Sequence, residues 1–155
     1  MMNAPRSCTY LQNATFRSVP MVSMKQGSTL LDCIVEDGKY SYVVKTLLPK
    51  STNFSILRYT EEQMTWVEEN EATIWSFIIQ RKLLYDTDRS KYLSLIAEGP
   101  ETKGLSNSPA RVGNYVGYKI VSKFMEENKV SIDSLMKITD ATTILNASKY
   151  KPTRK

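Results

Sequence analysis

The chain has 155 residues, of which 41% are hydrophobic and 24% charged, and its formal net charge is +5. This length and composition favour one globular domain around a single hydrophobic core. The sequence contains no histidine, so the chain alone cannot supply a Ser-His-Asp triad, a Cys-His pair or an H-E-x-x-H zinc helix. These classes of hydrolase site are therefore excluded.

The positive charge is concentrated in residues 149–155. Lys149, Lys151, Arg154 and Lys155 lie there, and removing these four charges from the net charge of +5 leaves +1 for the rest of the chain. A short cluster of this kind is typical of a solubilising basic tail, and an arm that binds nucleic acid or anionic lipid is the alternative. We expect no nucleic-acid partner.

The two cysteines and the apolar runs give little evidence of a compartment. Cys8 and Cys33 lack the spacing of a metal site, and they would form a disulfide only if the fold brought them together. The longest apolar run, residues 74–79, is far shorter than the roughly 20 residues that cross a bilayer. Residues 1–10 lack the apolar core of a secretory signal. We therefore expect either a cytoplasmic protein or part of a longer one.

The first predicted elements are an irregular segment and a helix. Residues 1–28 are polar and contain two prolines and a glycine, which predicts an irregular N-terminal segment. From Ser28 to Leu48 the apolar residues recur at helical spacing, and Pro49 ends the pattern. Gly38, inside this helix, indicates a kink or the close approach of another backbone.

A second helix is predicted from Thr60 to about Leu84. Thr60 and Gln63 have the spacing of a capping box. The apolar face of this helix contains Trp75 and also Glu71. Because a buried unpaired carboxylate is costly, we expect Glu71 to have a cation or a hydrogen-bond donor as its partner.

Arg111 is the candidate partner of Glu71, since a guanidinium can bind a carboxylate with two parallel hydrogen bonds at a dry site. We expect Glu71 to form a structural ion pair, and a real or vestigial functional site is the alternative. The other glutamates of residues 61–71 are explained by the helix dipole and by a solvated face.

Residues 85–97 predict a turn and a short helix. Asp88 is expected to cap a helix from Arg89 to about Ala97. The run of residues 86–90 resembles the start of a calcium loop, but it lacks the glycine and the glutamate that such a loop needs at its sixth and twelfth positions. Turn formation and capping explain these aspartates better.

The next helix is predicted to begin with Ser108 as the N-cap and Pro109 as the first helical residue. Gly113 and Gly117 lie four residues apart on its apolar side. Glycines at this spacing let a neighbouring helix approach closely, so they predict a packing notch.

Two short helices, capped by Ser131 and Asp140, complete the predicted fold. No strand pair, fixed repeat or long linker is evident. The sequence therefore predicts a mostly helical single domain of five to six helices over residues 29–148. Tyrosines and tryptophans fall within helical apolar patterns, which favours core positions over platforms for stacking nucleic-acid bases.

Several blocks of the sequence occur in the order of a known family. They are residues 35–39 (VEDGK), 70–77 (NEATIWSF), 83–88 (LLYDTD), 108–121 (SPARVGNYVGYKIV) and 144–152 (ILNASKYKP). Over about residues 29–153 the chain resembles the C-terminal half of the gliding-motility lipoprotein B (GldB) family of Bacteroidota. Its Pro-Ala-Arg-x-Gly-x-x-x-Gly block is fairly specific.

The resemblance implies a fold like the C-terminal helical part of a gluzincin. It also implies an envelope-associated lipoprotein connected with gliding motility and type IX secretion. The family is similar to predicted zinc peptidases, and Glu36 matches the position of their third metal ligand. A catalytic zinc site needs three protein ligands, and the chain has no histidine. We therefore expect no catalytic residue, metal or cofactor.

The leading hypothesis is a non-enzymatic interaction module that docks on other envelope proteins of the gliding and secretion machinery. Membrane attachment would come only from an upstream lipid anchor, because Cys8 does not match the acylated position, and this chain alone would be soluble. A degenerate or incomplete zincin-like peptidase is the alternative. The candidate structural or interaction residues are Glu71, Arg111, Gly113, Gly117, Glu36 and Trp75.

Overall fold

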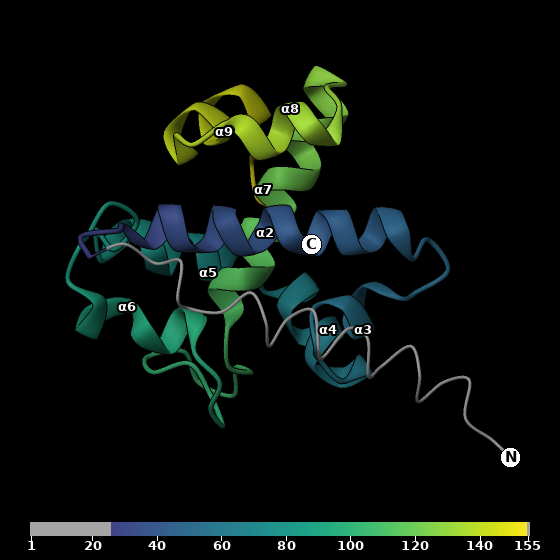
Figure 1. The fold of residues 1–155 in the computed structure, drawn as a ribbon. Coiled ribbons are helices and arrows are strands. Elements are labelled where there is room, and N and C mark those ends of the chain that lie inside the picture. Colours follow the sequence, from purple (N-terminus) through teal and green to yellow (C-terminus); the bar gives the residue numbers. More distant parts are fainter. Residues whose placement is uncertain (1–25, 155) are drawn as a thin grey trace, which may run out of the picture.

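The computed structural model describes residues 26–154, which contain eight helices and no strand (Figure 1). Two long helices, α2 (Leu30–Leu47) and α7 (Val112–Asn128), cross at the centre. The other helices are α3 (Asn53–Ile56), α4 (Glu61–Glu69), α5 (Glu71–Gln80), α6 (Arg89–Ile96), α8 (Ile132–Lys137) and α9 (Ala141–Ser148). In Figure 1, α8 and α9 lie above α2, and α3, α4 and α6 lie below it. The predicted helical domain is confirmed.

The crossing of α2 and α7 depends on glycines. A Cβ added to Gly117 would overlap the carbonyl oxygen of Ile34, and one added to Gly38 would overlap that of Gly117. A Cβ on Gly113 would lie 2.8 Å from the carbonyl oxygen of Leu95 on α6. The predicted packing notch is therefore present, and Gly38 marks a close approach of two backbones.

Most of the predicted N-caps are confirmed. Thr60 forms the predicted capping box with Gln63 at the start of α4, and Thr29 also forms one with Asp32 at the start of α2. Side-chain oxygens also cap α6, α8 and α9, at Asp88, Ser131 and Asp140 respectively. Each cap satisfies backbone N–H groups that have no partner within the helix.

The single helix predicted over residues 60–84 is wrong. α4 ends at Glu69 and α5 begins at Glu71, with Asn70 between them at φ −106° and ψ 15°. The Asn70 side chain donates a hydrogen bond of 2.8 Å to the carbonyl oxygen of Trp66. Such local side-chain bonds compete with regular helix geometry. α5 ends at Gln80, and Lys82 then adopts a positive φ of 55°.

The predicted start of α7 at Pro109 is also wrong. The Ser108 hydroxyl donates to the carbonyl oxygen of Leu105 at 2.8 Å, so it belongs to the preceding loop. Arg111 occupies the N-cap position in the left-handed conformation, at φ 60° and ψ 29°. The helix therefore begins at Val112. The short helix α3 was not predicted.

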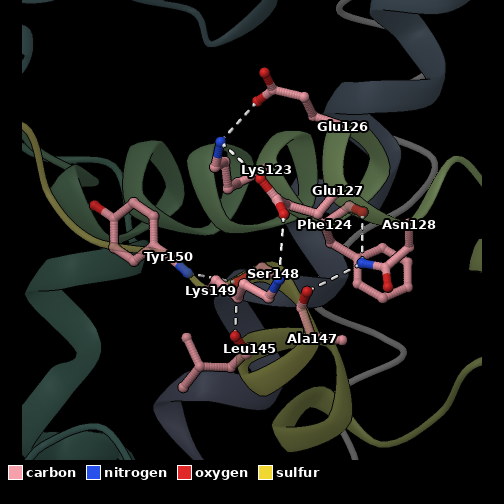
Figure 2. Close-up of polar contacts among 10 residues, drawn as sticks. All are labelled: Lys123, Phe124, Glu126, Glu127, Asn128, Leu145, Ala147, Ser148, Lys149 and Tyr150. Carbon is pink, nitrogen blue, oxygen red and sulfur yellow. Dashed lines mark hydrogen bonds and ion pairs between the residues drawn. The ribbon is translucent and has the colours of Figure 1, made fainter.

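The end of α9 is fastened to the end of α7 (Figure 2). The Asn128 side-chain amide donates to the carbonyl oxygen of Ala147 at 3.0 Å, and the Glu127 carboxylate lies 3.6 Å from the Lys149 ammonium group. These contacts hold the backbone next to Tyr150, whose N–H donates to the Ser148 hydroxyl. In residues 26–154, no helix is both long and apolar enough to cross a bilayer.

Candidate functional site

Glu71 is a buried carboxylate with two tyrosine partners. Its side chain is on α5, and the residue is only 2% exposed. The Tyr150 hydroxyl donates to Oε1 at 2.8 Å, and the Tyr115 hydroxyl donates to Oε2 at 3.5 Å. The rings of Trp75 and Tyr150 meet edge to face, with their centroids 5.2 Å apart. The partners that we expected for Glu71 are therefore neutral hydrogen-bond donors, and we call Glu71, Trp75, Tyr115 and Tyr150 the Glu71 clasp.

The clasp shifts the titration of its tyrosines. Burial, followed by the charge of Glu71, raises the pKa of Tyr115 and the pKa of Tyr150 well above the ordinary value of 10.0. Both hydroxyls therefore keep their protons and stay donors at neutral pH.

Arg111 has other partners, so the predicted ion pair with Glu71 is wrong. Its Nη1 donates to the carbonyl oxygen of Leu57 at 3.1 Å, and its Nη2 donates to that of Arg58 at 2.8 Å. The Arg111 guanidinium also lies over the ring of Tyr59, 5.2 Å from the centroid. In return, the Tyr59 hydroxyl donates to the Arg111 carbonyl oxygen at 2.8 Å. Arg111 therefore joins the start of α7 to the loop between α3 and α4.

A charged hollow of about 530 Å³ opens beside this junction, and we call it the Arg58 cavity. Its lining consists of Arg58, Tyr59, Gln63, Glu98, Gly99, Ala110 and Arg111. Two of these lining residues form an ion pair, with Arg58 Nη1 3.1 Å from Glu98 Oε1. The Glu98 side chain is 78% exposed and the Arg58 side chain 28% exposed. Ion pairs at the surface contribute only about 0–1 kcal/mol to stability, so Glu98, the exposed member of the pair, can leave Arg58 at small cost.

Asp37, on α2, is a second acidic residue whose charge interacts with both arginines of this cavity. It is half-buried. Burial raises its pKa above the ordinary value of 3.8, and the charges of Arg58 and Arg111 oppose that shift. Burial, together with the charge of Arg58, also lowers the pKa of Arg111 from its ordinary value. The cavity thus has two neighbouring guanidinium groups, the side chain best suited to binding a planar carboxylate.

A second hollow, of about 790 Å³, lies between the end of α5, helix α6 and the loop of residues 97–104. We call it the α6 groove. Its apolar lining includes Phe77, Leu93, Leu95 and Pro100, and Leu93 is 40% exposed. Glu98 and Gly99 line both the groove and the Arg58 cavity. The two hollows are therefore neighbours across a two-residue stretch of loop.

Gly104 and Arg81 hold Phe77 in the wall of the groove. Gly104 has a φ of 90°, and a Cβ added to it would lie 3.0 Å from the Phe77 ring. The Arg81 guanidinium lies 4.5 Å from the centroid of the same ring. The Phe77 ring thus packs against the Gly104 backbone and against the Arg81 guanidinium group.

Glu36 lies outside both hollows. It is half-buried, and its carboxylate lies 3.4 Å from the ammonium group of Lys39. Lys39 is only 4% exposed and also donates to the carbonyl oxygen of Ile138. Within residues 26–154, no cluster of three or more His, Cys, Asp or Glu side chains could hold a metal ion. Gly113 and Gly117 belong to the helix crossing, and Trp75 belongs to the Glu71 clasp.

The remaining sequence features have structural roles. Asp86 accepts hydrogen bonds from the Asp88 N–H at 2.8 Å and from Lys91 Nζ at 3.0 Å, as a turn requires. Cys33 is buried, with its sulfur 3.9 Å from the Tyr92 hydroxyl, while Cys8 lies outside the described residues. Tyr115 and Tyr118 are buried core residues, as expected.

Sequence reasoning missed Arg58, Glu98 and Asp37. Arg58 and Glu98 are 40 residues apart, and both are charged residues in loops, where charge is ordinary. The only local signal was the position of Asp37 inside a predicted helix beside an apolar run. Only the folded chain brings the two loop residues next to Asp37 on α2.

The family comparison agrees with the resemblance seen in the sequence. The family model described as gliding motility protein GldB matches residues 8–152. The chain belongs to the GldB family. The match begins earlier than the resemblance at residue 29 and contains the clasp, the cavity and the groove. Searches of curated proteins and of solved structures return no match. The expected similarity of the GldB family to zinc peptidases receives no support from these comparisons.

Proposed function

We propose that this GldB-family chain is a non-enzymatic interaction module that serves gliding motility by docking on other envelope proteins. The proposal rests on one observation: the buried charged side chains of the chain bind other parts of the fold. Glu71 binds tyrosines, Arg111 binds backbone carbonyl groups, and Lys39 binds the carbonyl group of Ile138. Each of these groups fastens one helix or loop to another, which favours a rigid frame that presents a surface.

The family match supports a role in gliding motility and a location in the cell envelope. Because the matched family is described as gliding motility protein GldB, we place the chain in the cell envelope with that machinery. We extend the proposal to partners shared with type IX secretion. A lipid anchor of the full-length family protein would supply its attachment to the membrane.

Co-purification followed by reconstitution tests the proposal. A gliding strain that lacks its own GldB-family gene would be complemented with the tagged full-length protein, and the envelope would be cross-linked before solubilisation. We expect defined envelope proteins to be recovered in constant ratio and to bind again when both components are purified. Lys137→Ala changes an exposed side chain at the end of α8, and we expect this variant to bind the same envelope proteins.

Two results would contradict this function. One is a purified full-length protein that holds stoichiometric zinc and cleaves peptides. The other is full rescue of gliding by a protein that forms no reconstitutable complex with any envelope component.

A further inference from the structure

We propose that the Arg58 cavity and the α6 groove together form a docking surface for an acidic peptide segment that also carries apolar side chains. The segment belongs to a partner protein. This inference rests on the proposed function as an interaction module, and it adds the chemistry of the partner.

The charge of the combined surface supports an acidic partner. Two acidic residues, Glu98 and Glu101, line the two hollows. Five basic residues line them as well: Arg58, Arg81, Lys91, Lys103 and Arg111. Lys91 is paired with Asp86 and Asp88. By contrast, Arg81 and Lys103 have no ion pair among the described residues, so these two residues supply the uncompensated positive charge of the groove. A patch of this sign attracts acidic segments and rejects basic ones.

The groove supplies the apolar contact that charge alone does not. Leu93 is 40% exposed on α6, and the ring of Phe77 forms part of the wall beside Gly104. Arg81 lies over this ring and Gly104 packs against it, so the wall is already formed without a partner. A preformed wall lowers the entropy cost of binding.

Glu98 occupies the position that a carboxylate of the partner would take. It lies 3.1 Å from Arg58 Nη1, is 78% exposed at its side chain, and lines both hollows. When a partner carboxylate replaces Glu98 on Arg58, one carboxylate contact is exchanged for another and the guanidinium keeps an anionic partner. Glu98 then turns into solvent. The chain's own carboxylate thus competes with the ligand for Arg58.

Arg111 has a different part in this surface. Its guanidinium binds the carbonyl groups of Leu57 and Arg58, so it holds the loop that carries Arg58. It also adds positive potential to the cavity. Arg58 and Arg81 are therefore the residues to change in a test, because Arg111 also supports the fold.

Fluorescence anisotropy with two peptides tests the proposal. The probe is a fluorescein-labelled peptide of alternating glutamate and leucine, and its match has glutamine in place of each glutamate. We expect the acidic peptide to bind at least tenfold more tightly than the glutamine peptide, and its affinity to fall as salt is added.

Two variants should weaken binding of the acidic peptide, and a third should strengthen it. Arg58→Gln and Arg81→Gln should each weaken binding of the acidic peptide about tenfold. Glu98→Gln should strengthen it several-fold, because the internal competitor is removed. Lys137→Gln should leave the affinity unchanged, because Lys137 ends α8, and α8 lies on the other side of α2 from α6 in Figure 1. Thermal melting of each variant shows whether it is folded, and a gain of affinity in Glu98→Gln cannot come from misfolding.

Several outcomes would overturn the inference. One is equal binding of the two peptides, and another is acidic-peptide binding that neither Arg58→Gln nor Glu98→Gln changes. A third is Arg58-dependent binding to phosphatidylglycerol vesicles without peptide binding, which would assign the surface to a membrane.

The proposed function can fail separately. Suppose that Arg58→Gln and Arg81→Gln abolish peptide binding, and that the full-length protein with the same substitutions still binds its envelope partners. The surface is then wrongly assigned, and the proposed function as an interaction module stands. If the peptide binds as expected and no envelope protein can be reconstituted, the proposed function is overturned.

Discussion

The crossing of α2 and α7 and the rim of the Arg58 cavity are built on opposite principles. At the crossing, glycine backbones touch, and any added carbon atom collides with a carbonyl group. At the rim, long charged side chains from separate loops meet, and Glu98 is mostly in solvent. The crossing leaves no room for change, whereas the rim can change its side chains without moving the helices. We therefore expect the crossing to determine stability and the rim to determine binding.

Gly117→Ala should have the largest effect on stability. Its new Cβ would overlap the backbone of Ile34, which cannot move aside as a flexible side chain can. We expect a loss of about 3 kcal/mol or more in the free energy of unfolding, measured by urea denaturation. Gly99→Ala is the matched control, since its Cβ would meet only the Glu101 carbonyl oxygen at 3.9 Å. A similar loss in both variants would contradict the packing of the crossing.

Arg111→Ala should come next. It removes two hydrogen bonds to backbone carbonyl groups and the contact with Tyr59, at an expected cost of about 2–3 kcal/mol. In a double-mutant cycle with Glu71→Ala, the two losses should add to within about 0.5 kcal/mol. A coupling energy above about 1 kcal/mol would restore the ion pair that the sequence predicted.

Tyr150→Phe should have a moderate effect. It removes the 2.8 Å donor of Glu71 and leaves, among residues 26–154, the longer contact from Tyr115. We expect the free energy of unfolding to fall by about 1–2 kcal/mol. Tyr85→Phe, at a residue 56% exposed, should have no measurable effect. An unchanged stability in Tyr150→Phe would show that the clasp is open in solution.

Asp37→Asn should have the smallest effect, and that effect should depend on pH. Because burial raises the pKa of Asp37 in the folded chain above 3.8, the folded chain holds this proton at pH values where the unfolded chain has lost it. Stability of the unmodified protein therefore falls as pH rises through the window between the two pKa values. The variant lacks this contribution, so its relative stability should increase from pH 4 to pH 7. A relative decrease would mean that Arg58 and Arg111 outweigh burial.

Local signals in the sequence predicted the helices and the crossing well. The capping box of Thr60 and the spacing of Gly113 and Gly117 depend on residues only three or four positions apart, so these signals hold in any fold that keeps the helix. The break at Asn70 was missed because an asparagine in an apolar pattern has no fixed conformation. Ser108 was assigned as an N-cap because no local signal shows that its hydroxyl donates a hydrogen bond to the Leu105 carbonyl oxygen.

The candidate site was less predictable because its contacts join distant loops. Arg111 reaches the carbonyl group of Leu57 over a separation of 54 residues, and left-handed backbone at Arg58 and Arg111 directs both side chains. Neither residue is a glycine or asparagine, the types that announce this conformation. The charge of Arg111 therefore predicted that it has a buried partner, but it did not show that the partners are backbone carbonyl groups and not Glu71.

The contact between Tyr150 and Glu71 also sets the order in which the domain can be completed. The two residues are 79 positions apart, and synthesis delivers Glu71 long before Tyr150. Until Tyr150 leaves the ribosome, closing the core around α5 would bury a carboxylate without its nearest donor, which is unfavourable. We therefore expect the core around α5 to close last, when the C-terminal segment that carries Tyr150 becomes available to Glu71.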